Sequence, residues 1–441
     1  MLQDFFWTFS ALMQSARETS WLDAAMKFFP YVLLLELPLL FMVSLGILRY
    51  GLRDRIPNRQ HLRFPKVSCI ITCYSEGNDV RKTIQSLAYQ EYAGVIEILP
   101  VVDGALQNAD TLKAAHSAAD TFGKRKNRQI MVLPKWQRGG RVSALNTGLQ
   151  FASGEVVLAL DGDTSFDNDM IANATAHFDD PDVVGVAGCL RVRNNGRSLA
   201  ARLQGLEYVL SIGAGKTGLS EFNLVNNISG AFGIFRAAFI RRMGGWDSGT
   251  AEDLDMTLRI KQYFGRHKNL RIVFDPHAVG HTDAPATWRG YFQQRLRWDG
   301  DLFYVFVRKY RLSFQPRLLG WPTFLFTVLN GLFLQLLMPF VIALYSIALF
   351  WVLPAGSALG ILAYVYLFYL LGLSFYFGLY LLAVSERPRY DLRYLIYLPL
   401  FPLFAYATRV HGAYAILQEI LLKSHLDSAM APWWVLRKTK F

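Results

Sequence analysis

Residues 155–163 read EVVLALDGD, an apolar run followed at once by two carboxylates on either side of a glycine. A short apolar run bounded by turn residues is typical of a buried strand. Asp161 and Asp163 then fall just past the end of that strand. In sheets covered by helices, ligands bind beyond the carboxyl ends of the strands. This stretch therefore predicts both a fold class and the edge of the sheet at which a site lies.

The same pattern continues through the middle of the chain, from about residue 66 to residue 283. Strands are predicted at 66–72, 95–102, 129–133, 155–160 and 183–190, and helices at 78–90 and 141–151. This alternation predicts an α/β domain with a mainly parallel sheet covered by helices. Asp103 follows the strand VIEILPVV as Asp161 follows EVVLAL, so both are expected at one edge of the sheet.

Composition points to a membrane protein. The 441 residues are 52% hydrophobic and carry a formal net charge of +12. Nucleic acid, an anionic membrane surface or a phosphorylated substrate could each explain the charge. Long apolar segments make the membrane surface the leading explanation, and arginines in cytosolic loops account for much of the excess. We expect a lipid bilayer as a partner and no nucleic acid.

Three segments are predicted to span the membrane: residues 31–48, 325–353 and 357–384. Arginines are concentrated after the first segment and in the loop after the third, which places the middle of the chain in the cytosol and residue 1 outside. Residues 394–422 are mostly apolar but contain two prolines, an arginine and a histidine. They either cross the membrane or lie at its interface, and we favour a crossing, although it would leave the basic carboxyl end outside.

Glu36 interrupts the first predicted span. A carboxylate inside a span is costly and usually faces a polar cavity or a partner. We expect Glu36 to line a polar path or to pair with Arg409. A protonated Glu36 packed against protein is an equally good reading.

Asp161-Gly162-Asp163 has the composition of a metal and diphosphate site. A nucleotide-sugar donor releases a diphosphate, and a divalent cation held by carboxylates would neutralise the developing charge. The alternative is a solvated turn. Asp103 would bind the base or ribose of the nucleotide, or it would only start a helix. Arg138-Gly139-Gly140-Arg141 would hold phosphate with backbone N–H groups, or it is a basic turn.

Two later motifs also have a purely structural alternative to their functional interpretation. Glu252-Asp253 begins a helix, where acidic residues are favoured by the helix dipole, but one carboxylate could be the general base that deprotonates an acceptor hydroxyl. Residues 294–298, QRLRW, lie on an amphipathic helix before the second span. Trp298 would stack on an acceptor sugar with Arg297 near the diphosphate, or both would anchor the helix at headgroup depth.

The ordered motifs at 102–104, 161–163, 252–253 and 294–298 resemble those of processive family 2 glycosyltransferases: cellulose, chitin, hyaluronan and poly-N-acetylglucosamine synthases. The resemblance covers residues 66–298 and, in architecture, the whole chain. It implies a glycosyltransferase-A fold, inverting transfer from a nucleoside diphosphate sugar and a β-linked product.

The resemblance also assigns roles to individual positions. It implies a catalytic base in Asp253 with Glu252 beside it, Mg²⁺ or Mn²⁺ at Asp163, and acceptor contacts at Gly230 and Trp298. The positions implied to bind the nucleotide sugar are Thr72, Tyr74, Glu76, Asp103, Arg141, Asp161, Gln294 and Arg297.

The chain departs from the family pattern at several points. Ala251 stands where the usual motif has threonine, and Arg141 stands where a lysine is usual, which keeps the charge but not the geometry. Residues 72–76, TCYSE, replace the commoner Pro-x-Tyr-Asn-Glu. Residues 227–232, NISGAF, lack the Phe-Phe-Cys-Gly of cellulose synthases and are closer to bacterial poly-N-acetylglucosamine synthases.

We therefore expect a multi-pass enzyme of the inner membrane that polymerises N-acetylglucosamine from a UDP-sugar onto a growing polysaccharide and exports it, with a possible small membrane partner subunit. The alternatives are a UDP-glucose-dependent glucan synthase, a non-processive glycolipid enzyme and a catalytically silent assembly protein. The expected organisation is an amino-terminal segment with a first span (1–50), a basic linker (51–65), a catalytic domain (66–283), interface helices (284–320), transmembrane helices (321–422) and a basic tail (423–441).

Overall fold

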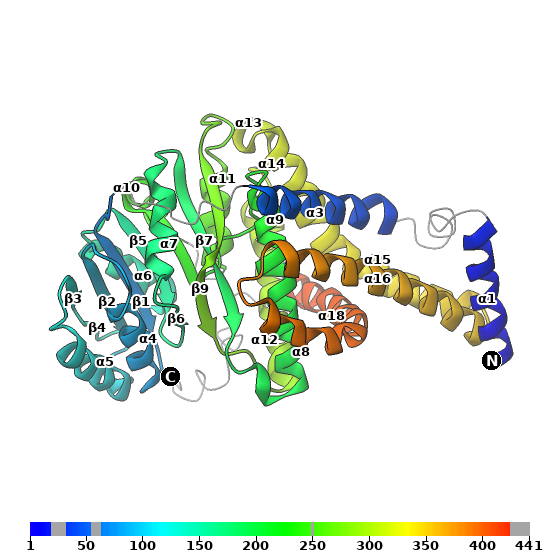
Figure 1. Cartoon of the computed structure of the whole chain (residues 1–441), viewed down its shortest axis with the longest axis horizontal. Coiled ribbons are helices and arrows are strands. Elements are labelled where there is room, and N and C mark those ends of the chain that lie inside the picture. The colour runs from blue at the N-terminus through cyan, green and yellow to red at the C-terminus, as the bar shows by residue number, and fades with distance from the viewer. Residues whose placement is uncertain (19–31, 54–62, 248–250, 424–441) are drawn as a thin grey trace.

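The computed structural model describes residues 1–18, 32–53, 63–247 and 251–423. Most of the expected linker and nearly all of the expected basic tail therefore lie outside the described residues. The described chain forms an α/β domain continued by an elongated group of helices (Figure 1).

A nine-stranded sheet organises the α/β domain within the described residues, in the order β3-β2-β1-β5-β8-β7-β9-β6, with β4 also paired to β2. Its centre is β1 (Val67–Cys73), flanked in parallel by β2 (Ile96–Asp103) and β5 (Val156–Asp161). The other strands are β6 (Ser165–Phe166), β7 (Val183–Val192), β8 (Phe232–Arg236) and β9 (Arg271–Thr282). Strand β8 runs antiparallel between β5 and β7. The predicted mainly parallel α/β sheet is confirmed.

The strand predicted at 129–133 is interrupted. It forms β3 (Arg128–Ile130) and β4 (Leu133–Lys135), which pair with residues 96–98 and 101–103 of β2. Pro100 lies on β2 between those two paired stretches. A proline has no backbone N–H to donate to a neighbouring strand, so the ladder breaks opposite it.

Helices cover both faces of the sheet. Alternate residues of β1 point to opposite faces, so Cys69 and Ile71 join one hydrophobic cluster and Ile70 joins the other. The first cluster packs under α4 (Asp79–Ala88), α5 (Ala109–Phe122) and α7 (Met170–Ala176). The second packs under α6 (Gly140–Phe151), α10 (Ala237–Arg242) and α11 (Glu252–Lys261).

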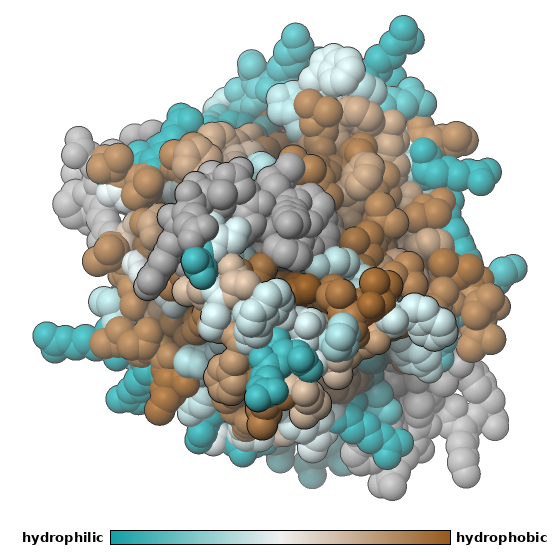
Figure 2. Space-filling model, turned by 90° about the vertical axis from the view of Figure 1, so that its right-hand side faces the viewer, coloured by the Kyte–Doolittle hydropathy of each residue, from teal (hydrophilic) through white to brown (hydrophobic). Residues whose placement is uncertain are grey.

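Three helical stretches of the described chain are long and apolar enough to cross a membrane: Leu34–Leu52, Trp321–Val352 and Ala355–Ala383. They match the three predicted spans. The first comprises the end of η1 (Val32–Glu36) and α3 (Leu37–Leu52); the others are α14 (Trp321–Phe326), η6 (Thr327–Leu337) and α15 (Met338–Val352), then α16 (Ala355–Ala383). Hydrophobic side chains cover much of the face that Figure 2 shows, which is the right-hand side of Figure 1. The exposed apolar residues of these helices include Leu344, Ile347, Trp351, Leu371 and Phe375.

An amino-terminal helix that the sequence did not predict, α1 (Leu2–Glu18), packs against α16 at the end far from the sheet (Figure 1). Two glycines permit this contact. A Cβ on Gly356 would lie 2.2 Å from the backbone oxygen of Met1, and one on Gly360 would lie 3.1 Å from the Cβ of Thr8. Small residues spaced by four positions allow close approach of helices in this way.

The last helix, α18 (Phe401–Leu422), follows η7 (Leu392–Leu400) and runs beside α12 (Trp288–Phe303). The ring of Phe404 lies 6.2 Å from that of Trp288 near the start of both helices. Glu419 near the end of α18 pairs at 3.1 Å with Arg308 on η5 (Tyr304–Lys309), which follows α12. Although α18 is 22 residues long, it is not among the three candidate spans of the described chain. It packs on α15 and α16 as well as on α12, and the crossing expected for residues 394–422 stays a prediction.

Glu36 pairs with Arg409 of α18, as predicted. The hydroxyl of Tyr369 on α16 donates to the other carboxylate oxygen of Glu36 at 2.5 Å. The Glu36 side chain is only 13% exposed. The first candidate span is thus joined to α18 by an ion pair and to α16 by a hydrogen bond.

Breaking this pair is expected to destabilise the protein. Glu36→Gln or Arg409→Met leaves one charge buried without its partner, which typically costs about 3–5 kcal/mol. The double variant Glu36→Gln/Arg409→Met removes both charges, so it should lose less stability than the sum of the single variants. Thermal unfolding of detergent-solubilised protein measures all three. Additive losses would show that the two residues do not interact.

Candidate functional site

The carboxyl ends of β1, β2 and β5 form one edge of the sheet. The register of the parallel pairs sets Cys73 beside Val102 and Thr72 beside Asp161. Asp103 and Asp161 therefore end neighbouring strands on either side of β1, at the same edge, as the sequence predicted. The turn after β1 contains Ser75 with φ of 74°, a left-handed conformation that few non-glycine residues adopt.

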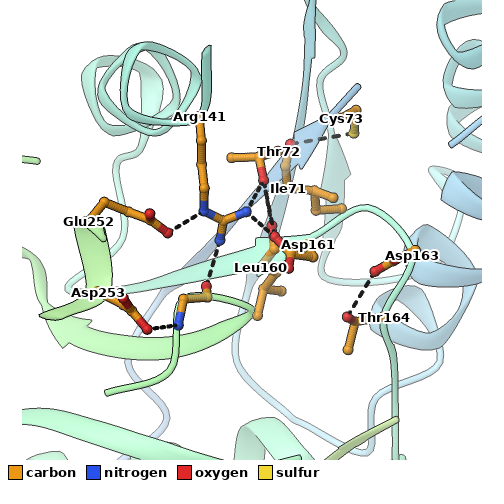
Figure 3. Close-up of polar contacts among 11 residues, drawn as sticks. Ile71, Thr72, Cys73, Arg141, Leu160, Asp161, Asp163, Thr164, Glu252 and Asp253 are labelled. Carbon is orange, nitrogen blue, oxygen red and sulfur yellow. Dashed lines mark hydrogen bonds and ion pairs between the residues drawn. The ribbon is translucent and has the colours of Figure 1, made fainter. Parts of the chain in front are cut away.

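Arg141 is the centre of the polar network at this edge (Figure 3). Its guanidinium forms an ion pair with Asp161 and another with Glu252. It also donates to Thr72 Oγ1 at 2.9 Å and to the backbone oxygen of Gly230 at 2.6 Å. One arginine from the start of α6 thus joins residues of β1, β5, the loop before β8 and α11. A planar guanidinium with several fixed donors suits this branched arrangement better than a lysine would.

Glu76, Asp161 and Asp163 form a group of carboxylates beside that network. A Cβ on Gly162 would lie 3.1 Å from Cγ and Cδ of Glu76, so the Glu76 side chain lies directly against the DGD turn. Burial raises the pKa of Glu76 to about 7, and the charges of Asp163 and Asp161 add to the rise. Burial likewise raises the pKa of Asp163 to about 6, again with a contribution from Asp161. A cation beside Glu76 and Asp163 would favour their ionised forms, which burial and the neighbouring negative charges disfavour.

The donor set fits a divalent cation in part. Oε2 of Glu76 is buried and has no hydrogen-bond partner, so an acceptor is free beside the DGD turn. Carboxylate oxygens are the ligands that Mg²⁺ prefers, with the other positions taken by water and substrate phosphates. Within the described ranges, however, no three His, Cys, Asp or Glu side chains are gathered as a metal site. The protein would therefore supply one or two ligands rather than a full cage.

Asp103 accepts hydrogen bonds from several neighbours. Lys135 Nζ donates to it at 2.8 Å, and the backbone N–H groups of Gly139 and Gly140 donate at 2.9 and 2.8 Å. These N–H groups begin α6, and we expected them to hold phosphate. In this structure they hold the Asp103 carboxylate instead, because a helix start favours any nearby negative charge.

Tyr74 lies at the same end of the sheet. The guanidinium of Arg138 lies over the Tyr74 ring, 4.6 Å from its centre. The Tyr74 hydroxyl is buried and has no hydrogen-bond partner. The Tyr74 hydroxyl is thus an unused hydrogen-bond donor beside Arg138.

Asp253 and Glu252 open α11 and face different partners. Glu252 is taken up by Arg141, whereas Asp253 Oδ2 accepts from the backbone N–H of Gly230 at 3.1 Å and from Asn227 Nδ2 at 3.3 Å. Its other oxygen accepts from the N–H of Leu254 at 2.8 Å. Among the described residues, Asp253 thus accepts only from neutral donors, whereas Glu252 is held in an ion pair by Arg141.

The QRLRW motif lies on α12. Arg295, for which no separate role was predicted, pairs with Glu207 at 2.6 Å, and its guanidinium lies 4.5 Å from the centre of the Trp298 ring. Oε1 of Gln294 is buried without a hydrogen-bond partner. The helix is tied to the site through its end, where Leu302 packs in one cluster with Ala251.

The structure therefore joins some of the predicted site residues and separates others. Within the described chain, one hydrogen-bonded network contains Thr72, Arg141, Asp161, Gly230, Glu252 and Asp253. Gln294, Arg297 and Trp298 lie outside it, on α12. The sequence analysis missed Lys135 and Asn227, which hold Asp103 and Asp253. Lys135 comes two residues after the strand predicted at 129–133, and that position was the signal by which it could have been found.

Comparison with known proteins adds the following. Residues 65–300, more than half of the chain, match the family described as glycosyltransferase-like family 2. The chain is 28% identical over 273 residues to a poly-beta-1,6-N-acetyl-D-glucosamine synthase of Staphylococcus epidermidis, an alignment that covers 62% of this chain and 60% of that protein. It is 27% identical over 253 residues to a protein of the same name from Staphylococcus aureus, covering 57% and 58%. The aligned part is thus about three fifths of these relatives' length.

Among solved structures, the fold is similar to that of the mannosyltransferase PcManGT from Pyrobaculum calidifontis in complex with GDP-Man and Mn2+. The TM-score is 0.54, with 18% sequence identity over 88% of this chain and 96% of that one. At this identity the similarity concerns the fold alone.

Proposed function

The chain belongs to glycosyltransferase-like family 2, and from that premise we propose that it transfers N-acetylglucosamine from UDP-N-acetylglucosamine to a growing β-linked polysaccharide, with inversion at the sugar. The observation that carries the proposal is the Arg141 network, which joins Asp161 to the loop and helix that hold Asp253. The names of the staphylococcal relatives support the sugar.

The roles of the residues follow from their surroundings. Asp253 removes the proton of the acceptor hydroxyl as that oxygen attacks the sugar, since among the described residues its partners are neutral donors, whereas Glu252 is paired with Arg141. Arg141 keeps Asp161 and Glu252 in place at the edge of the sheet. Tyr74 and Asp103 bind the nucleotide, with Thr72 close to the diphosphate.

Asp163, with Glu76 beside it, would hold Mg²⁺ or Mn²⁺. A divalent cation bound there would neutralise the charge of the departing UDP. The unpaired Glu76 oxygen and the raised pKa values of Glu76 and Asp163 support this assignment.

We further propose a multi-pass protein of the inner membrane with three spans and a cytosolic catalytic domain at 66–283. Residues 284–320 form interface helices, and α18 packs on α12 and on α15 of the second span, with Arg409 paired to Glu36 of the first span. The three spans and the interface helices would form the route for the polymer.

Donor preference tests the function directly. Purified protein is incubated with UDP-N-acetylglucosamine or UDP-glucose, and UDP release and product length are measured. We expect faster release with UDP-N-acetylglucosamine and a polymer that a β-1,6-N-acetylglucosamine-specific hydrolase degrades. The 2-acetamido group needs a hydrogen-bond partner and an apolar wall, which a site built for glucose does not supply. A preference for UDP-glucose, or a product of one or two sugars, would refute this assignment.

Trp298 is expected to bind the acceptor sugar. Trp298→Ala should lower polymer elongation about 10²-fold through a misplaced acceptor, while the protein remains folded and membrane-inserted. Trp288→Ala is the matched control, since Trp288 is on the same helix and packs on Phe404. Product sizing on gels measures both. Normal elongation by Trp298→Ala would make Trp298 an interface anchor only.

A further inference from the structure

Lys216 is a buried lysine below the loop that precedes β8. It ends η4 (Val209–Lys216), and 3% of its surface is exposed. Its ammonium group donates to the backbone oxygen of Asn227 and to Ser229 Oγ, each at 2.9 Å. Lys216 therefore fixes both ends of the short segment 227–229.

That segment is the one that holds Asp253. Asn227 Nδ2 and the N–H of Gly230, directly after Ser229, both donate to Asp253 Oδ2, at 3.3 and 3.1 Å. The oxygen of Gly230 in turn accepts from Arg141 at 2.6 Å. A shift of the segment would therefore move Asp253 and its connection to Arg141 together.

The buried charge of Lys216 is costly. Burial lowers the pKa of Lys216 to about 8, and the negative charge of Asp253 offsets part of that fall. A group with this pKa is still mainly protonated at neutral pH. A buried charge of this kind contributes little to stability, since an apolar side chain of similar size commonly stabilises the folded protein as well or better.

The helix that carries Lys216 is fixed to the membrane helices. Just after Lys216, α9 (Thr217–Ser220) packs on α3 so closely that a Cβ on Gly218 would lie 2.3 Å from the backbone oxygen of Val43. On η4 itself, a Cβ on Gly213 would lie 3.0 Å from the ring of Tyr380 on α16. Lys216 thus stands between the helices α3 and α16 and the loop at the site.

We propose that Lys216 is a positioning residue for sugar transfer: from a helix fixed to α3 and α16, it holds the 227–230 segment and thereby aligns the Asp253 carboxylate. The inference rests on the proposed function, in which Asp253 accepts the proton of the acceptor. It adds a residue that touches neither donor nor acceptor but sets where the base stands.

A second buried lysine provides the matched control. Lys261 of α11 is 2% exposed, and its ammonium group donates to the oxygen of Asn226 at 3.4 Å and lies 5.9 Å from the centre of the Phe326 ring. Burial lowers its pKa to about 7, and the charge of Lys216 adds to the fall. Lys261 is therefore a second lysine that is equally buried and contacts the same loop, but it contacts Asn226 rather than Asn227 and Ser229.

The experiment compares Lys216→Met, Lys216→Arg and Lys261→Met in full-length protein in nanodiscs. Lys216→Met should lower kcat about 10–10²-fold through misalignment of the base, with the Kd for UDP unchanged. Lys216→Arg should recover part of the loss, because it restores a donor and a charge. Lys261→Met should keep a kcat close to that of the unmodified protein. In an Asp253→Asn background, Lys216→Met should have no further effect on kcat.

The outcomes separate the two proposals. Normal kcat for Lys216→Met, together with a severe loss for Asp253→Asn, would overturn the role of Lys216 and leave the function intact. Equal losses of kcat and thermal stability in Lys216→Met and Lys261→Met would reduce Lys216 to a structural residue. Normal turnover of Asp253→Asn would refute the assignment of the base, and the role of Lys216 with it.

Discussion

Replacing Asp253 with asparagine is expected to lower sugar transfer by about 10²–10⁴-fold, the range typical of removing a general base. Asparagine keeps the shape of the side chain and can still accept from Gly230 N–H, but it cannot take up the acceptor proton. Binding of UDP should survive, because Asp253 lies on α11 rather than in the carboxylate group of the DGD turn. Initial rates of UDP release, with UDP binding measured by calorimetry, test both parts.

Glu252→Gln is the control for that variant. Glu252 is paired with Arg141, so its loss should disturb the network without removing the base. We expect a smaller fall in turnover than with Asp253→Asn. The reverse order of effects would assign the base to Glu252, and near-normal turnover in both variants would place it elsewhere.

The second large effect is expected at Asp163. Activity should require Mg²⁺ or Mn²⁺, and Asp163→Ala should lose UDP binding as well as turnover, because the diphosphate then lacks the cation that offsets its charge. Titration of UDP with and without each metal, and assays in chelator followed by added metal, measure this.

Asp283→Ala is the comparison variant for Asp163→Ala. Asp283 is an exposed carboxylate that pairs with Arg193 at 3.1 Å, and Arg193 in turn donates to the backbone oxygen of Asp163. The loss of Asp283 therefore removes a negative charge near Asp163 without removing a carboxylate of the DGD turn. The variant should retain metal-dependent UDP binding. Full activity of the unmodified protein in chelator would exclude a metal requirement.

Much of the fold followed from patterns within single segments. EVVLALDGD predicted a buried strand with carboxylates at its end, and β5 with Asp161 at its last position confirms it. The common edge for Asp103 and Asp161 followed from the parallel arrangement alone. The pairing of Glu36 with Arg409 followed from the cost of an unpaired charge in an apolar span.

What could not be predicted depends on contacts between distant segments. Nothing near Arg141 in the sequence indicates that it joins four elements, because Gly230 in the loop before β8 and Glu252 at the start of α11 come far along the chain. The break between β3 and β4 arises from Pro100 on another strand. The packing of α18 on α12 and α15 likewise joins segments that are far apart in the sequence, so it appears only in three dimensions.

The contact between Glu36 and Arg409 has a consequence for how the protein is made. The two residues are 373 positions apart, and Tyr369 is 333 positions after Glu36. At about 5–20 residues per second, synthesis reaches Arg409 roughly 20–75 s after Glu36 has been added to the chain. In the proposed topology, the first span (Leu34–Leu52) therefore enters the bilayer while Glu36 has no partner, and it acquires its final contacts only when α18 has been made. In nascent chains stopped before α18, the first span should accordingly be loosely held and accessible to membrane proteases.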